Sequence, residues 1–260
     1  MPPITVYGSS TCEDSAIAVS RLRVLGVPFD EVDIDRDGAA EQRVIELNGG
    51  ARITPTIVFE PTGDAVAEPT LEDLGARLAA TGHDVRSARA IDYHGELVTR
   101  SLPVRRLPTA DGGDFSLDRL RGRRQAALFL AHDAACLVCH GYARQLARRE
   151  AEFAEVDGTP IIVVDADPAQ AAHWRDGIAP GIAIVADAGG GWKSAIASLL
   201  DLDPADAILV MLDRFGAPRA GSAGADAGAL IDPLEAIDWL RYLALECPEC
   251  SGEIAWPSSP

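Results

Sequence analysis

Residues 126–146 have the sequence AALFLAHDAACLVCHGYARQL, which decides the fold expected for the second half of the chain. The apolar run over 126–131 predicts a buried strand, and the spacing of apolar residues predicts a helix over 141–156. Cys136 and Cys139 lie in the loop between them. When two cysteines at the start of a helix are separated by two residues, their sulfurs lie within disulfide range and only the first sulfur is exposed. The stretch therefore predicts an α/β domain with a redox-active pair at a strand-to-helix turn.

The same cysteine pair is compatible with other roles. His140 follows Cys139 directly, so the motif also matches covalent haem attachment, which needs an export signal that the sequence does not show. Metal binding and a fold that retains inert cysteines are further alternatives. His132, four residues before Cys136, is a candidate acceptor for a thiol proton, although a single histidine at a strand end is more often structural.

Strand and helix patterns alternate through residues 108–245. We expect strands at 160–164, 182–185 and 207–212 and helices at 168–174, 195–200 and 233–245. The glycine run at 189–191, close to the sole lysine Lys193, predicts a turn. The pattern favours one α/β domain over 108–245.

The first 83 residues predict a separate and smaller α/β unit. Its pattern is strand, helix, strand, helix, strand, strand, helix, at 4–8, 16–25, 29–34, 39–47, 56–59, 65–67 and 71–80. Residues 84–107 break the alternation and are predicted to form a linker. A chain of 260 residues is long enough for two such domains.

Composition and charge limit the classes of partner. The chain is 47% hydrophobic and 24% charged, which excludes wholesale disorder. Its net charge of -17 argues against nucleic acid or an anionic membrane as a partner. The apolar runs are far shorter than the roughly 18 residues of a membrane helix, and the first twenty residues lack a signal-peptide pattern. We therefore expect a cytoplasmic protein.

Five cysteines divide into a single residue and two pairs: Cys12, Cys136 with Cys139, and Cys247 with Cys250. In a reducing compartment such pairs are more often catalytic or metal-binding than structural disulfides. Cys247-Pro-Glu-Cys250 begins a tail over residues 246–260 and resembles half of a zinc site. The tail has three possible roles: redox relay, metal binding with zinc or an iron–sulfur cluster, or neither.

Cys12 lies between a predicted strand and the first turn of a helix, where the helix dipole favours a thiolate. Glu13 and Asp14 oppose this effect, and no lysine or arginine lies within five residues. Because position 15 is Ser15, Cys12 has no local partner, but a monothiol can still exchange with a mixed disulfide that a second thiol molecule resolves. The alternative is a cysteine at a helix start without chemistry.

Residues 3–82 resemble the glutaredoxin family, particularly the mycoredoxins. The resemblance rests on Ile4-Thr-Val-Tyr-Gly8, Thr11-Cys12-Glu-Asp-Ser15, Gly26-Val-Pro-Phe-Asp-Glu-Val-Asp-Ile-Asp35, Leu47-Asn-Gly-Gly50 and Ile53-Thr-Pro-Thr-Ile-Val-Phe59. It implies that Pro55 is cis and that the backbone of Thr54 pairs with a low-molecular-weight thiol such as glutathione or mycothiol. The sequence departs from the family at Ser15, where a second cysteine is usual.

The second half resembles the thioredoxin-like superfamily, nearest to its redoxin or peroxiredoxin branch. The matching stretches are Phe115-Ser-Leu-Asp-Arg-Leu-Arg-Gly122, residues 128–139 and Ala207-Ile-Leu-Val-Met-Leu-Asp-Arg-Phe-Gly216. The resemblance implies that Cys136 attacks a disulfide and that Cys139 occupies the position of the peroxide-reactive cysteine. Because the peroxiredoxin threonine and arginine are absent, we expect disulfide exchange rather than peroxidase activity.

Together these patterns predict an α/β protein of two thioredoxin-fold domains in tandem, each with a central mixed β-sheet flanked by helices. The expected function is a thiol–disulfide oxidoreductase acting on protein or small-molecule disulfides through Cys12 and the pair of Cys136 and Cys139, with the tail pair as a relay. The alternative is a non-enzymatic scaffold in which Cys136, Cys139, Cys247 and Cys250 bind zinc.

Overall fold

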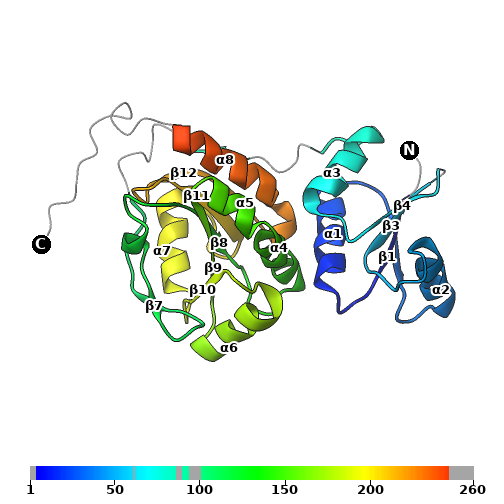
Figure 1. Cartoon of the computed structure of the whole chain (residues 1–260), viewed down its shortest axis with the longest axis horizontal. Coiled ribbons are helices and arrows are strands. Elements are labelled where there is room, and N and C mark those ends of the chain that lie inside the picture. The colour runs from blue at the N-terminus through cyan, green and yellow to red at the C-terminus, as the bar shows by residue number, and fades with distance from the viewer. Residues whose placement is uncertain (1–3, 61, 86–89, 94–100, 246–260) are drawn as a thin grey trace, which may run out of the picture.

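The computed structural model describes residues 4–60, 62–85, 90–93 and 101–245 of the chain. Two β-sheets, each with helices against it, form two domains that lie side by side (Figure 1). A further two-stranded sheet pairs β6 (Leu107–Pro108) with β7 (Asp114–Phe115). Among the helices of the described residues, none combines the length and the apolar content that crossing a membrane requires.

The first domain follows the order of elements that the sequence predicts. It contains β1 (Ile4–Gly8), α1 (Glu13–Val24), β2 (Asp30–Asp33), α2 (Gly38–Leu47), β3 (Thr56–Phe59), β4 (Asp64–Ala67) and α3 (Leu71–Ala80). The strands lie in the order β2-β1-β3-β4, with β2 parallel to β1 and the other pairs antiparallel. Buried side chains of β1, α1, β3 and α3 form its core.

The second domain contains the larger sheet, in the order β10-β9-β8-β11-β12-β5. Its principal elements are β5 (Ile91–Asp92), β8 (Gln125–Leu130), α4 (Leu137–Arg148), α5 (Glu150–Glu155), β9 (Gly158–Val164), α6 (Pro168–His173), β10 (Ala183–Ala186), α7 (Gly191–Leu200), β11 (Ala207–Leu212), β12 (Pro218–Gly224) and α8 (Pro233–Leu245). Every residue of β8 and β11 is buried, as expected for central strands covered by helices on both faces.

The two sheets share one core topology. In the second sheet β9 is parallel to β8, whereas β8 with β11 and β11 with β12 are antiparallel, so β9-β8-β11-β12 repeats the arrangement of β2-β1-β3-β4. A helix follows the first strand of each core, α1 after β1 and α4 after β8. The prediction of two thioredoxin-fold domains, each a mixed sheet flanked by helices, is confirmed.

The local differences from the predictions have physical causes. The helix predicted over 141–156 begins at Leu137 instead, so Cys139 lies in its first turn, and it divides at Arg149 into α4 and α5. Strand β12 was not predicted, because its sequence PRAGSAG lacks the β-branched residues that indicate a strand. Strand β5 lies in the segment predicted as a linker and pairs with β12, but two residues carry no periodicity.

Helices α1 and α4 join the two domains by close packing (Figure 1). A Cβ at Gly141 of α4 would lie 2.5 Å from the carbonyl oxygen of Glu13 and 2.8 Å from Cγ2 of Ile17, so only glycine permits this approach. Around it Arg21 donates a hydrogen bond to the carbonyl of Leu230, and the Leu71 N–H donates one to Gln145 at 3.1 Å.

We predict that Gly141→Ala destabilises the protein by about 1–3 kcal/mol, because a backbone oxygen cannot move aside as a side chain can. The matched control is Gly75→Ala in α3, where a Cβ meets nothing within 4 Å. There alanine should stabilise the helix by about 1 kcal/mol. Urea denaturation of both variants measures the difference, and equal effects of the two substitutions would contradict the close approach of α1 and α4.

Candidate active site

Cys136 is positioned by the junction of β8 and α4. The buried strand leads into a short loop that ends at Cys136, the N-cap of α4, whose Sγ accepts a hydrogen bond from the Cys139 N–H at 3.4 Å. The first N–H groups of a helix have no partner within the helix, so this sulfur takes the place of a capping oxygen. Cys136 is half-buried, whereas Cys139 is fully buried behind it.

The loop before Cys136 is held at the carbonyl of Ala134. His140 Nε2 donates to this oxygen at 2.8 Å, and Trp174 Nε1 donates to it at 3.1 Å. The rings of His140 and Trp174 meet edge to face, with centroids 4.8 Å apart. His140 therefore supports the loop from a buried position through its Nε2.

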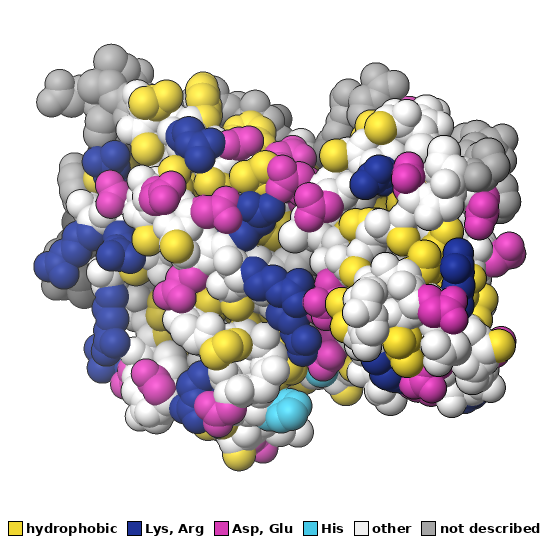
Figure 2. All heavy atoms as spheres, turned by 45° about the vertical axis from the view of Figure 1, so that its right-hand side comes forward, with side chains coloured by type: hydrophobic (Ala, Val, Ile, Leu, Met, Phe, Trp, Pro, Cys, Tyr) yellow, Lys and Arg dark blue, Asp and Glu magenta, His cyan; other side chains and the backbone are white. Residues whose placement is uncertain are grey.

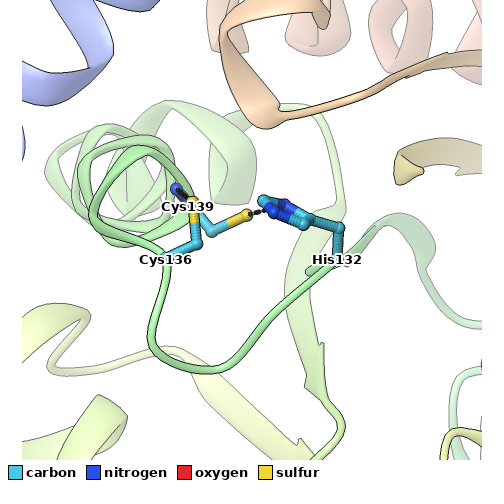
Figure 3. Close-up of side chains that lie close together, drawn as sticks. All are labelled: His132, Cys136 and Cys139. Atoms are coloured by element: carbon cyan, nitrogen blue, oxygen red, sulfur yellow. Dashed lines mark hydrogen bonds between the residues drawn. The ribbon is translucent and has the colours of Figure 1, made fainter. Parts of the chain in front are cut away.

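His132 contacts the buried cysteine. Its Nδ1 lies 3.2 Å from Cys139 Sγ (Figure 3). The ligand atoms of His132, Cys136 and Cys139 all lie within 4.8 Å of one another. The sequence suggested His132 as an acceptor for the proton of a thiol, and the structure places it next to the second cysteine of the pair rather than the first.

The two thiols of the pair have opposite electrostatic environments. A hydrogen bond from the Cys139 thiol, together with the backbone N–H groups of α4 and the charge of His132, lowers the pKa of Cys136 to about 6. Donation of that hydrogen bond and burial raise the pKa of Cys139. At neutral pH Cys136 is a thiolate and Cys139 a thiol, which is the arrangement of an attacking and a resolving cysteine.

Lys193 is a member of this site that sequence reasoning missed. Its side chain is buried, and Nζ donates to the carbonyl of Ala131, next to His132, at 3.0 Å. Burial lowers the pKa of Lys193, and the nearby Cys139 opposes that shift. The Asp187 carboxylate accepts the backbone N–H groups of Trp192 and Lys193, which fixes the start of α7. The only signal in the sequence was that Lys193 is the single lysine of the chain.

Cys12 occupies the corresponding position in the first domain. It is the N-cap of α1, its Sγ accepts the Ser15 N–H at 3.4 Å, and its thiol donates to the carbonyl of Thr54 at 3.4 Å. The peptide bond between Thr54 and Pro55 is cis, as the resemblance implied. Thr54 and Pro55 thus lie beside the half-buried Cys12 thiol.

The structure does not bring Cys12 and Cys136 together. Glu13, at the start of α1, pairs with Arg144 in the second half of α4. A hollow of about 610 Å³ is lined by Val138 at the start of α4, by both halves of α1, and by Ser9 and Ser10 next to Cys12. The backbone of Glu13 lies against Gly141, five residues of helix after Cys136, which is about 7.5 Å along the helix axis. The two thiols cap two different helices, one in each domain.

Cys247 and Cys250 lie outside the described residues, and only their attachment point can be assessed. Helix α8 ends at the exposed Leu245, and Leu240 lies beside the start of β9, which pairs with the start of β8. Cys136 follows the opposite end of β8. The four-cysteine zinc alternative and the relay role of the tail pair therefore stay predictions.

Comparison with known proteins agrees with the geometry of the first domain. The glutaredoxin family model matches residues 4–62. A Mycobacterium tuberculosis protein assigned to the glutaredoxins is 32% identical over 75 residues, which cover 88% of that protein and 29% of this chain. The chain belongs to the glutaredoxin family. The match spans the first domain, with Cys12, Thr54 and Pro55, so this part is the glutaredoxin domain.

Solved structures resemble the chain more distantly. Peroxidoxin BcpB from M. tuberculosis has a TM-score of 0.47 and 20% identity, over 56% of this chain and 97% of that one. M. tuberculosis DsbF has a TM-score of 0.42 and 17% identity, over 55% and 99% of the two chains. Because these identities and TM-scores are low, the chemistry of the domain that carries Cys136 follows from its own residues and not from these structures.

We predict that alkylation of Cys136 by iodoacetamide rises with pH about a midpoint near 6, because the thiolate is the reactive form. Cys139→Ala removes the hydrogen-bond donor that lowers the pKa of Cys136 most. The midpoint should then rise toward about 8.5, the ordinary pKa of a cysteine thiol. Peptide-resolved mass spectrometry separates Cys136 from the other thiols. A midpoint unchanged by Cys139→Ala would show that Cys139 does not stabilise the thiolate.

Proposed function

We propose that the protein is a thiol–disulfide oxidoreductase in which Cys136 attacks protein or small-molecule disulfides and Cys139 resolves the intermediate. The observation that carries the proposal is the half-buried Cys136 thiolate with a protonated, buried Cys139 directly behind it. A cysteine pair without a redox role would not require one thiol to be ionised and the other to be protonated. The topology supports it too, because the pair sits where the helix after the first core strand begins.

The exchange requires two displacements. The Cys136 thiolate attacks one sulfur of the substrate disulfide, forms a mixed disulfide and releases the other sulfur as a thiolate, which takes a proton from water. Cys139, which lies beside His132 Nδ1, then attacks the Cys136 sulfur, and the second substrate sulfur leaves as a thiol with the proton that Cys139 gives up. Two electrons pass from the cysteine pair to the substrate. A thiol or dithiol reductant must restore the pair.

Cys12 provides a second and separate exchange site. Cys12 attacks a mixed disulfide that contains a low-molecular-weight thiol, takes over that thiol in a mixed disulfide of its own and releases the substrate thiol. Because Ser15 replaces a resolving cysteine, a second molecule of the small thiol then reduces the mixed disulfide on Cys12. The proposed cosubstrate is glutathione or mycothiol, with its peptide portion paired to the backbone of Thr54 beside the cis Pro55. Cys12 caps α1 in one domain and Cys136 caps α4 in the other, so each site works with its own partner.

We expect Cys136→Ser to abolish reduction of insulin disulfides and Cys139→Ser to accumulate a mixed disulfide with the substrate, because resolution is then blocked. Cys12→Ser is the matched control and should leave insulin reduction within about twofold, since Cys12 caps a helix of the other domain. Turnover and the mass of trapped adducts measure these effects. Unchanged turnover in Cys136→Ser would refute the proposal.

A metal site is the second candidate, favoured by the clustering of His132, Cys136 and Cys139. Tetrahedral zinc binds sulfur at about 2.3 Å and nitrogen at about 2.0 Å, and two thiolates with one imidazole form a donor set that it accepts. The donors fit with small side-chain movements. Zinc bound there would hold the loop to α4 and block disulfide exchange, as a scaffold role requires. The fourth ligand would be water or a tail cysteine, Cys247 or Cys250.

Native mass spectrometry of the full chain after incubation with zinc distinguishes the two candidates. The redox proposal predicts no retained metal and a loss of about 2 or 4 Da on oxidation, two hydrogens for each disulfide formed by the two cysteine pairs. A scaffold instead retains one zinc, loses it in His132→Ala and protects Cys136 from alkylation. Retention in His132→Ala but not in Cys247→Ser would favour the four-cysteine alternative.

A further inference from the structure

Arginines of the second domain surround the acidic residues next to Cys12. Glu13 pairs with Arg144 at 3.2 Å, and the same Asp14 oxygen lies 3.7 Å from Arg144 and 3.0 Å from Arg148. Within the described part of the chain these are the ion pairs of Glu13 and Asp14, and both partners belong to α4. Figure 2 shows blue and magenta side chains meeting at the boundary between the domains.

The contact is built into the interface. The missing side chain at Gly141 brings the backbone of Glu13 against α4, which places Arg144, one helical turn later, opposite the carboxylates. Only 5% of the Asp14 side chain and 23% of that of Glu13 are exposed, so water screens these charges less than it screens surface charges. The first domain thus carries two acids beside its thiol, and the second domain supplies the compensating cations.

We propose that Arg144 and Arg148 are positioning residues of the Cys12 site: they neutralise Glu13 and Asp14 and so admit disulfides that carry carboxylates. This inference rests on the proposed exchange at Cys12. Without the arginines, two carboxylates at the first turn of α1 would repel an anionic disulfide and attract a cationic one. The substrate class is therefore a mixed disulfide with an acidic small thiol, and its selection depends on the neighbouring domain.

The test uses the full chain with Cys136, Cys139, Cys247 and Cys250 changed to Ser, so that Cys12 alone reacts. The probes are dithiodipropionate, 2-hydroxyethyl disulfide and cystamine, which are anionic, neutral and cationic aliphatic disulfides. Mass spectrometry follows the mixed disulfide on Cys12 at about 0.02 M salt, where charges act over about 20 Å.

Arg144→Gln should slow the reaction of dithiodipropionate by about threefold to tenfold, leave 2-hydroxyethyl disulfide within about twofold and accelerate cystamine. Arg144→Lys should restore most of the anionic rate, and about 1 M salt should remove the difference. The matched control is Arg149→Gln. Arg149 crosses the same interface to Glu72 but also pairs with Glu152 and not with Glu13 or Asp14, so its loss should change the ratio of anionic to cationic rates much less than Arg144→Gln does.

An unchanged ratio in a folded Arg144→Gln variant would overturn the inference while leaving exchange at Cys12 intact. An equal change in Arg149→Gln would also overturn it, because loosening of the interface would then be the cause. If Arg144→Gln does not fold, Glu13→Gln in the same background must raise the anionic rate relative to the cationic one, and a constant ratio refutes the inference. If the parent forms no mixed disulfide with any probe, exchange at Cys12 and the inference both fail.

Discussion

Helices α1 and α4 approach each other so closely at Gly141 that no side chain fits between them, and most of the molecule's organisation depends on this contact. It fixes the orientation of two domains with the same strand order. It holds together the two helices that begin at Cys12 and Cys136, one from each domain. It also places the arginines of α4 against the acids that follow Cys12.

Both domains use a cysteine sulfur as the N-cap of a helix, with the same sulfur-to-nitrogen distance of 3.4 Å. The surroundings then make the two sites different. Cys136 has a second thiol behind it, with His132 and Lys193 beyond. Electrostatic interactions among these buried groups are stronger than in water, because little water is present to screen them. Cys12 has Ser15 at the equivalent position and the backbone of Thr54 beside it. The same cysteine N-cap therefore belongs to a dithiol in one domain and to a monothiol in the other.

The sequence predicted those parts of the fold and site that depend on local patterns. Apolar runs identified the central strands β8 and β11, and the motif spacing located Cys12, Cys136 and Cys139 at helix starts. It could not predict β12, whose glycines and alanines pack well only because β11 and Tyr93 cover them, nor the role of Lys193, which meets Ala131 from a distant helix. The pairing of Glu13 with Arg144 joins residues 131 positions apart, so no local pattern carries it.

The core of the second domain does not end at the domain boundary. Ile17 of α1 and Leu71 of α3 are buried in the same apolar cluster as Phe129, Tyr142 and Leu240. If the glutaredoxin domain detached, these two side chains and the apolar flank of α4 would be exposed to water together, at a cost of about 25 cal/mol for each Å². Two domains that are separate in topology are therefore coupled in stability, and the chain should fold as one cooperative unit.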